Sequence, residues 1–544
     1  MALVELDLVP YLPDPPAPPR PDHRRPPEPP APAPACIPEY RGLLAHASPA
    51  GRWFQRVLEM LPGAVTWLLV TSPIWAGLLL PRPFALAVLA FDIFWLYLSV
   101  TTAIRAVRGY RRLRAAERTD WHAACRAAER DGRAFARWDE IIHIVIIPNY
   151  KEPVSLLRRT LASLAAQANA RQIVVVLAME AREQGAGQRA RTLEHEFAGA
   201  FAGIFSTFHP AGLPGEVVGK SSNENWAARI AKRRVVDELG YDLRNVTVTS
   251  CDADTVFHPG YFPCLTYKFA TDPHRHRRFW QSPILLTNNI WQTPALLRVG
   301  SALAGTHILA NLCKRDRVVF PQSTYSLSLQ MADDVGYWDT DVIPEDWHMF
   351  LKCFFTFSGA VEVEPIYLPT GNDAVRASST WRSFVEAYQQ HKRHAWGASD
   401  IPYAIREMLA HKEMTWRRRL RRVVALSSNH LLWTTHWFLL SLGWWAPWVA
   451  GRLVGLDTDV YGLHLAARVV LTLCFIPYAV MIAVDALLRP PKPASWSRPK
   501  DIADYLVWFA LPATSFIFST IPALVAQTRL MVGRRLEYRV TEKA

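Results

Sequence analysis

Two carboxylates, Asp252 and Asp254, stand one residue apart directly after the β-type run VTVTSC at 246–251. Side chains alternate along a strand, so residues i and i+2 share a face. Where a strand gives way to a loop, two such carboxylates can bind one hard cation together. Oxygen ligands of this kind suit Mg²⁺ or Mn²⁺, and a Mg²⁺ site typically combines one or two carboxylates with substrate phosphates. Because Asp-x-Asp also occurs by chance in surface loops, the neighbouring patterns must decide its meaning.

Short apolar runs rich in β-branched residues predict the strands that would position this acidic pair. They cover 141–147, 173–177 and 246–249, and a helical pattern at 154–166 follows the first run. Strands that alternate with helices predict a doubly wound α/β sheet, whose ligands bind at the carboxyl ends of the strands. The loop after the first strand, Glu180 after the second and Asp252 with Asp254 after the third should therefore converge on one crevice.

Apolar blocks on both sides of this region predict an integral membrane protein. The blocks 63–80 and 83–104 are each about the ~20 residues that cross a hydrocarbon core, and further blocks cover 423–450, 464–488 and 505–530. The stretch 110–422 is polar enough to form a water-exposed domain. The last block is too short for two full spans and contains Pro512 and Pro522, which can break a helix. It predicts a kinked or re-entrant pair, and one span with an outside tail is the alternative.

Arginines next to the spans predict the orientation, because cytoplasmic loops carry an excess of Lys and Arg. One cluster follows the second span and another precedes the third, so both ends of the polar domain should be cytoplasmic. These clusters account for much of the formal net charge of +13 and favour anionic lipid headgroups over nucleic acid as a partner. The seven cysteines show no CxxC spacing, so neither a disulfide framework nor a zinc site is expected.

These features predict six segments. They are a proline-rich disordered cytoplasmic leader (1–50), a transmembrane hairpin (51–109), a cytosolic catalytic-type domain (110–400), a basic interfacial helix (401–422), a transmembrane bundle (423–533) and a cytoplasmic tail (534–544).

Five short motifs in order carry a resemblance to a known family. They are IPNYKEP at 147–153, GKSSNENWA at 219–227, DAD at 252–254, PED at 344–346 and QQHKRHAWG at 389–397. Together they resemble the membrane-bound family 2 glycosyltransferases, which include bacterial cellulose synthase and hyaluronan synthase. The resemblance covers roughly 140–400. It implies a GT-A fold inserted between transmembrane helices, a location in the inner (cytoplasmic) membrane, and a nucleotide-sugar donor, with UDP-hexose or UDP-N-acetylhexosamine expected.

The resemblance also implies roles for the donor-side residues. Asp254, with Asp252 near the ribose and the metal, would hold Mn²⁺ or Mg²⁺ against the departing diphosphate. Glu180 would face the nucleoside, and Lys220 and Arg393 would meet phosphate oxygens, for which arginine suits bidentate contact. The remaining predicted donor-binding residues lie in the loop after the first strand: Pro148, Tyr150 and Glu152.

On the acceptor side, Asp346 takes the position of the last acid in the family's Thr-Glu-Asp motif. It is the predicted general base, which typically contributes ~10²–10⁴-fold to the rate, and a single displacement would invert the anomeric configuration. Glu345, Gln390 and Trp396 are the predicted acceptor-binding residues. The chain departs from the family at Pro344, which replaces the threonine, and at Trp396, which lies two residues beyond the family's Gln-x-x-Arg-Trp position. On a helix that displacement turns the indole by about 200°.

Three alternatives to a polysaccharide synthase remain open. The displaced tryptophan leaves room for a non-processive enzyme that adds one sugar to a lipid. An inactive membrane protein that senses carbohydrate or scaffolds an assembly is possible, although the presence of Asp252, Asp254, Asp346 and Arg393 argues against it. A transporter is disfavoured because the spans are few and most of the chain is the polar domain.

Overall fold

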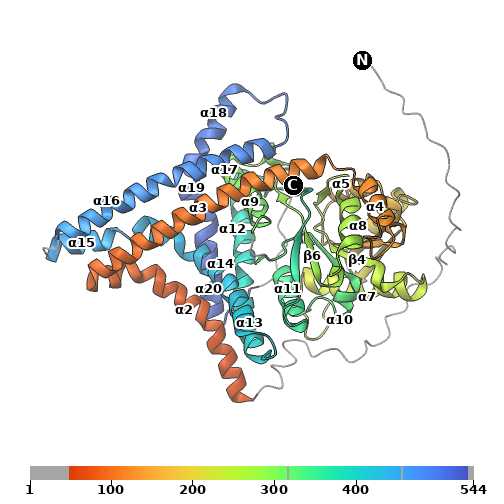
Figure 1. Ribbon diagram of the computed structural model, residues 1–544, viewed down its shortest axis with the longest axis horizontal. Helices are drawn as coiled ribbons and strands as arrows, with labels where there is room; N and C mark the ends of the chain where they lie inside the picture. The colour runs from red at the N-terminus through yellow and green to blue at the C-terminus, as the bar shows by residue number, and fades with distance from the viewer. Residues whose placement is uncertain (1–47, 315–317, 455–456, 537–544) are drawn as a thin grey trace. The chain divides into compact units, whose positions relative to one another are not determined.

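The computed structural model describes residues 48–314, 318–454 and 457–536. Residues 1–47 of the predicted proline-rich leader and residues 537–544 of the predicted tail lie outside the described residues. Figure 1 shows a sheet-containing domain in the middle of the sequence and long helices from both ends of the described chain.

A mixed seven-stranded sheet is the centre of the polar domain. Its strands are β1 (Ile142–Pro148), β2 (Ile173–Glu180), β3 (Gly203–His209), β4 (Val246–Ser250), β6 (Arg278–Gln281), β8 (Tyr325–Ser328) and β9 (Glu362–Pro365). They lie in the order β3-β2-β1-β4-β8-β6-β9. The strands β1 to β4 are mutually parallel, and β8 runs antiparallel to both β4 and β6. The predicted α/β sheet is confirmed, with one reversed strand that the sequence did not indicate.

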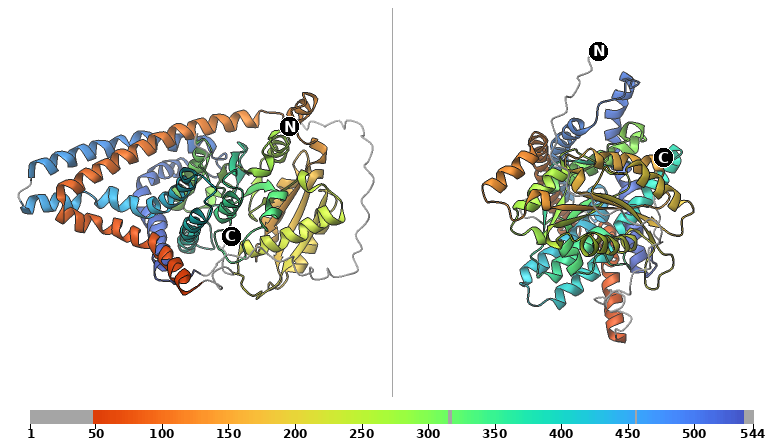
Figure 2. Two further views of the ribbon diagram at one scale, coloured as in Figure 1. Left: turned by 60° about the horizontal axis from the view of Figure 1, so that its bottom comes forward. Right: turned by 90° about the vertical axis from the view of Figure 1, so that its right-hand side faces the viewer.

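The sheet is buried on both faces, which explains why its strands read as continuous apolar runs. Along β1, Ile144 and Ile146 point into one hydrophobic cluster, whereas Val145 and Ile147 point into another. The first cluster is completed by α7 (Lys220–Lys232), α10 (Leu329–Asp334) and α11 (Glu345–Thr356). The second is completed by α5 (Val154–Ala165), α6 (Ala186–Glu196) and α8 (Tyr261–Thr271). Figure 2 shows the strands between these helical layers.

A second, small sheet lies beside the carboxyl end of β4. It contains β5 (Val256–Phe257), β7 (Ile284–Leu285) and β10 (Thr370–Gly371), in the order β5-β10-β7. Because β5 follows the acidic pair after only one residue, this sheet brings the loops after β7 and β10 next to Asp254. Residues more than 100 positions apart in the sequence thereby share one edge of the domain.

Four helical runs among the described residues are long and apolar enough to cross a membrane. Two are α2 (Pro49–Leu79) and α3 (Pro81–Glu117), which contain the two predicted N-terminal spans. The third, Gly462–Leu488, combines the end of α16 (Asp457–Leu473) with α17 (Phe475–Leu488). The fourth, Pro499–Met531, is one irregular run rather than a pair of segments. Its turns change type near Pro512 and Pro522, as expected where a helix lacks backbone donors, and it ends in α20 (Ile521–Met531).

The apolar block predicted at 423–450 is not among these four runs. It is divided between α14 (Trp416–Leu442) and α15 (Trp445–Val454). The first turns of α14 contain the arginine cluster, and its buried face includes His430, Thr434 and Thr435. These polar groups lower the mean hydropathy of α14, which packs against α2. The predicted basic interfacial helix corresponds to α13 (Asp400–Ala410) and the arginine-rich start of α14.

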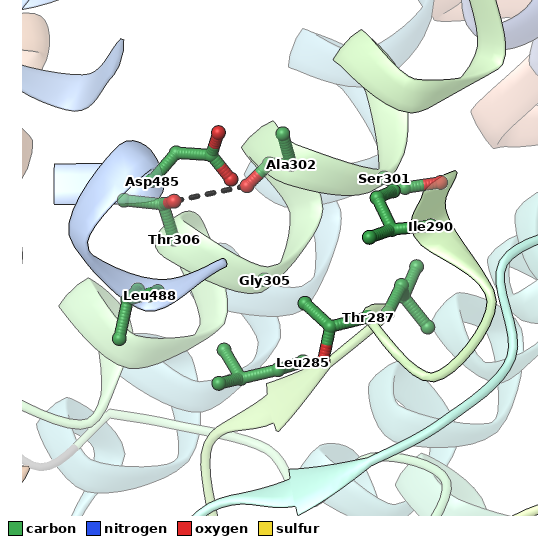
Figure 3. Close-up of a pocket in the computed structure, with 10 residues that line it drawn as sticks. Leu285, Thr287, Ile290, Ser301, Ala302, Gly305, Thr306, Asp485 and Leu488 are labelled. Carbon is green, nitrogen blue, oxygen red and sulfur yellow. Dashed lines mark hydrogen bonds between the residues drawn. The ribbon is translucent and has the colours of Figure 1, made fainter. Parts of the chain in front are cut away.

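The helices from both ends of the chain pack directly on the polar domain. α3 contacts α9 (Ala295–Asn311) and α17, and α12 (Thr380–Ala395) contacts α20. The seam between α9, α17 and β7 leaves a hollow of only about 10 Å³ (Figure 3), close to the smallest space that holds a water molecule. Around it, Thr306 donates to the Ala302 carbonyl at 2.9 Å, and Asp485 pairs with Arg489. The catalytic-type domain and the long helices are therefore closely packed where they meet.

Candidate active site

Four elements converge at the carboxyl end of β4. The turn after β4 contains Asp252, α7 begins at Lys220, and α11 begins at Glu345 and Asp346. The segment just before β8 joins them, because β8 pairs antiparallel to β4 with Tyr325 opposite Ser250. The carboxyl edge of a parallel strand and the starts of two helices are thus placed at one crevice, where α/β proteins bind ligands.

Lys220 lies at the centre of this cluster. Its Nζ is 2.9 Å from Asp252 Oδ1, 2.8 Å from Glu345 Oε1 and 3.8 Å from Glu224 Oε1. Burial opposes its charge, but the neighbouring carboxylates outweigh burial and raise the pKa of Lys220 well above its usual value. The ammonium therefore stays charged between Asp252 and Glu345, and this excess of carboxylates over ammonium favours a further cation.

Ser323 connects three members of the cluster through three different groups. Its hydroxyl donates a hydrogen bond to Asp252 Oδ2, its carbonyl accepts one from Lys220 at 3.0 Å, and its N–H donates to Asp346 Oδ2 at 3.1 Å. Its φ of 55° lies in the left-handed region, where a non-glycine residue costs roughly 1–2 kcal/mol. Backbone strain of this kind is typical of functional sites. The sequence does not predict this role, because the residue type of Ser323 indicates neither its strained backbone conformation nor the pairing of β8 with β4.

Asp346 has the properties of a base that works near neutral pH. Burial and the adjacent charge of Glu345 raise the pKa of Asp346 to about 7, although the N–H groups of Ser323 and Trp347 stabilise its ionised form. The general base of an enzyme is most effective when its pKa lies near the working pH. The start of α11 thus holds a half-buried carboxylate that exchanges its proton in the physiological range.

Glu224 is a further carboxyl group of the cluster to which sequence reasoning assigned no role. It is fully buried one helical turn after Lys220, and Ser250 Oγ donates to its Oε1 at 2.5 Å. Burial raises the pKa of Glu224 to about 8, so the group is protonated at neutral pH. The only signal in the sequence was its position within the GKSSNENWA motif.

The Asp254 carboxylate contacts the loop after β10 of the small sheet. Asp254 is 1% exposed, and its carboxylate accepts from the N–H of Asp373 at 2.9 Å and from Asn372 Nδ2 at 3.4 Å. Asn288 Nδ2 donates to the Asp254 carbonyl at 3.1 Å. These contacts fix the Asp254 carboxylate in place through loops that lie more than 30 and more than 110 residues away in the sequence.

The donor set at this edge fits a hard divalent cation that the substrate helps to bind. Asp252 and Asp254 offer carboxylate oxygens, and the Asp252 side chain keeps 31% of its surface exposed. Within the described part of the chain, no group of three or more His, Cys, Asp or Glu side chains is placed to hold a metal ion. Mg²⁺ sites commonly use one or two carboxylates and complete the shell with phosphate oxygens and water.

A second polar cluster lies two strands away, at the carboxyl ends of β2 and β3. Glu180 is 5% exposed, with its carboxylate 3.1 Å from Arg182 and 3.6 Å from His209. The Arg182 guanidinium lies 4.5 Å from the ring centre of Tyr150. The Glu152 carboxylate accepts from the Tyr150 N–H and so orders the loop after Pro148. The predicted residues of this loop and Glu180 therefore do lie together, although Glu180 is already paired with two cations.

Of the predicted residues on α12 and directly after it, the structure buries one and leaves two partly exposed. Gln390 and Arg393 are partly exposed on a helix that packs on α20. Trp396 is 7% exposed and belongs to the hydrophobic cluster under the sheet. An acceptor could not lie against the Trp396 indole without displacing core side chains, which weighs against its predicted role in acceptor binding.

A buried ionic network supports the start of α11 from behind. His348 is 2% exposed, with Nδ1 2.8 Å from Asp400 and Nε2 2.9 Å from Asp339. Burial opposes protonation, but the two carboxylates outweigh it and raise the pKa of His348 to about 10. The imidazolium, two residues beyond Asp346, therefore joins α11 to α13 and to the turn at Asp339.

Comparison with known proteins identifies the class. Residues 247–486 match the family model described as "Glycosyl transferase family group 2". No curated protein matches the chain. Among solved structures, the mannosyltransferase PcManGT from Pyrobaculum calidifontis, in complex with GDP-Man and Mn²⁺, is 15% identical with a TM-score of 0.40, covering 75% of this chain and 98% of that chain. GalNAc-T7 with UDP, GalNAc and Mn²⁺ is 10% identical with a TM-score of 0.31, covering 54% and 58%. Likenesses at these TM-scores carry no conclusion about this chain.

The protein is a glycosyltransferase by the match of its residues 247–486 to family group 2, and its polar domain contains a mixed seven-stranded sheet. The matched region begins within β4, so it contains Asp252, Asp254, Asp346 and Arg393 but neither Glu180 nor Lys220. It also extends past the sheet domain through α14 and into α17. The helices beyond the sheet are therefore part of the matched region rather than an unrelated addition.

Proposed function

We propose that this protein is a metal-dependent, inverting glycosyltransferase of the inner membrane that transfers a hexosyl unit from a UDP-sugar. The observation that carries the proposal is the cluster at the end of β4, where Lys220, Asp252, Ser323 and Asp346 are joined by direct contacts. It combines carboxylate oxygens for a cation, a fixed ammonium and a carboxylate with a pKa near 7. A non-catalytic scaffold would have no need for this combination.

Donor binding would use both polar clusters. The nucleoside would lie toward Glu180 and the Tyr150 loop, and the diphosphate toward Asp252 and Asp254. Adjacent strands of a sheet are ~4.8 Å apart, so the two clusters are about 10 Å apart across β1. That separation suits a ligand with a base at one end and a diphosphate at the other. Lys220 is already paired with Asp252 and Glu345, so it would stabilise developing phosphate charge from within this network.

Asp252 and Asp254 are the residues that would hold Mn²⁺ or Mg²⁺. The bound cation would offset the negative charge that develops on the departing diphosphate. Asp254 is oriented for this role by the backbone N–H of Asp373, and Asp252 by the Ser323 hydroxyl. Both carboxylates are therefore held in place before a ligand arrives, which is the condition for effective electrostatic stabilisation.

Asp346 would remove the proton from the acceptor hydroxyl as the new bond forms. Glu345 keeps the pKa of Asp346 high enough to accept that proton, and the N–H groups of Ser323 and Trp347 hold the ionised carboxylate in position. With a single base and no protein nucleophile in the scheme, direct displacement inverts the anomeric carbon.

The acceptor is a polysaccharide or a lipid, and one observation favours a lipid that receives a single sugar. Trp396 is packed in the core, so it is not placed to hold a growing chain. In the proposed topology the catalytic domain faces the cytosol, with α2, α3, Gly462–Leu488 and Pro499–Met531 in the bilayer. The proposed domain boundaries remain those expected from the sequence.

The direct test is donor turnover by the full chain in lipid nanodiscs, with a panel of UDP- and GDP-sugars and with Mn²⁺, Mg²⁺ or EDTA. We expect cation-dependent release of one nucleotide, at least about 100-fold lower in Asp346→Asn and also lost in Asp254→Ala. Asp139→Asn, which neutralises an exposed carboxylate paired with Arg137, is the matched control.

The size of the product then shows which acceptor is used, since a polysaccharide and a single-sugar glycolipid differ on a gel or by mass spectrometry. Full activity in both site variants would refute the assigned site. Activity with GDP-sugars alone would refute the UDP assignment while leaving the enzyme class intact. No turnover with any donor and acceptor would favour the scaffold alternative.

A further inference from the structure

An apolar groove of about 400 Å³ runs between α3 and α17, away from the catalytic cluster. The wall on α3 is formed by residues at helical spacing on one face, and the opposite wall by the first turns of α17. These residues are Val100, Ala103, Ile104, Val107, Arg108 and Arg111 on α3, and Ile476, Pro477 and Val480 on α17. Figures 1 and 2 show the two helices side by side, in orange and blue, as their contacts also require.

The length of the groove matches one leaflet of a bilayer. From Val100 to Arg111 the helix rises about 16 Å at ~1.5 Å per residue, which is about half of the ~30 Å hydrocarbon thickness. Its floor contains Ala103, which is 4% exposed and packs against the seam with α9. Its rim contains Ile104 and Ile476, which are 45% and 66% exposed. The groove therefore has a small residue at its floor and larger apolar residues at its rim.

One end of this groove has two exposed arginines. Arg108 and Arg111 lie one turn apart on α3 and are exposed. Within the described residues neither side chain has an ion pair or hydrogen bond, whereas the nearby Arg105, Arg112 and Arg114 are bound to Thr101, Tyr367 and Glu117. Arginine binds phosphate oxygens in a bidentate manner, and basic pockets between membrane helices bind anionic headgroups.

We propose that this groove binds one anionic phospholipid of the surrounding bilayer. Its phosphate pairs with Arg108 and Arg111, and one acyl chain fills the space between α3 and α17. The proposal rests on the membrane location proposed above, but not on the identity of donor or acceptor. Arg112, the next residue on α3, donates to the Tyr367 hydroxyl at 2.7 Å, so the helix that carries this site is also attached to the catalytic-type domain.

The test is native mass spectrometry of the full chain released from nanodiscs of equal phosphatidylglycerol and phosphatidylcholine. We expect wild type to retain one phosphatidylglycerol in preference to phosphatidylcholine. With about a five- to sixfold contribution from each arginine, Arg108→Gln with Arg111→Gln should weaken that retention about 30-fold. Ile104→Trp, which fills the groove from its rim without removing charge, should also reduce it.

The matched control is Arg118→Gln with Arg126→Gln, two exposed cations of the same region outside the groove. It should retain the lipid as wild type does. Equal retention of both lipids by wild type, unchanged retention in the arginine pair, or equal loss in the control would each overturn the proposal. Since the readout is a bound lipid, it is independent of turnover, and a failure here leaves the proposed transferase function untouched.

Discussion

Replacing Glu345 by glutamine removes the negative charge next to Asp346 and should shift the acidic limb of the pH–rate profile to lower pH. Burial comes first and the Glu345 charge second among the causes that raise the pKa of Asp346 to about 7. Lys220 acts in the opposite direction, because its cation favours the ionised form of Asp346. The two neighbours therefore predict shifts of opposite sign from two single substitutions.

The size of the shift follows from the contacts. A charge within a few ångströms typically moves a carboxyl pKa by about 1–3 units. The lower end applies here, because the Glu345 charge is partly offset by Lys220 at 2.8 Å. If the pKa of Asp346 falls from about 7 to about 6, the ionised fraction at pH 6 rises from about 9% to about 50%. The rate at pH 6, relative to the plateau of each enzyme, should therefore increase about fivefold in Glu345→Gln.

Lys220→Met should have the opposite effect, with the relative rate at pH 7 falling from about half of the plateau to about a tenth. The assay is kcat/KM between pH 5.5 and 9 at constant ionic strength, with each variant normalised to its own plateau. Normalisation separates the pKa of the base from any loss of donor affinity. Glu140→Gln, which neutralises an exposed acid 3.7 Å from Arg137, controls for general charge effects.

The reasoning is refuted if both substitutions leave the acidic limb in place, or if both move it in the same direction. In the first case Asp346 is not the group that titrates in turnover. In the second, the limb reports a change of metal or donor binding rather than the two opposing charges.

Three further predictions concern the buried ionisable groups. Because the folded pKa of Asp346 lies above its unfolded value, stability falls as pH rises from about 4 to about 7. At pH 8, Asp346→Asn should therefore be inactive but more stable than wild type, by about 2–4 kcal/mol in the free energy of unfolding. A higher melting temperature would show this. Burial likewise raises the folded pKa of Glu224 from 4.5 to about 8, so wild type loses stability as pH rises between these two values. Glu224→Gln should therefore match wild type near pH 4 in a thermal melt and exceed it at pH 9, and equal melts at both pH values would contradict the protonation of Glu224. Removing the imidazolium in His348→Leu leaves Asp339 and Asp400 buried without their cation, and should destabilise the fold by about 3–5 kcal/mol. Wild type should itself lose stability as pH rises toward the raised His348 pKa of about 10, and a pH-independent difference between the two would show that the network is not ionic.

The local pattern of the sequence was enough to determine the strands and the acids at their ends. An apolar run bounded by polar residues has few alternatives to a buried strand, so β1, β2 and β4 could be placed to within a few residues of their observed bounds. The convergence of Glu180 and Asp252 on one edge then follows from the parallel arrangement alone. The spans α2 and α3 were equally predictable, because their length and composition depend on no distant contact.

Only the tertiary structure decided which groups complete the site. Ser323 lies 71 residues from Asp252, and Asp373 lies 119 residues from Asp254. Their contacts depend on the antiparallel pairing of β8 with β4 and on the small sheet formed by β5, β10 and β7. No local signal fixes such pairings, since short strands of two to four residues carry too little pattern to specify a partner or a register. The burial of Trp396 and the pKa values of Asp346 and Glu224 are likewise properties of the packed site, because desolvation and neighbouring charge do not exist until the chain has folded.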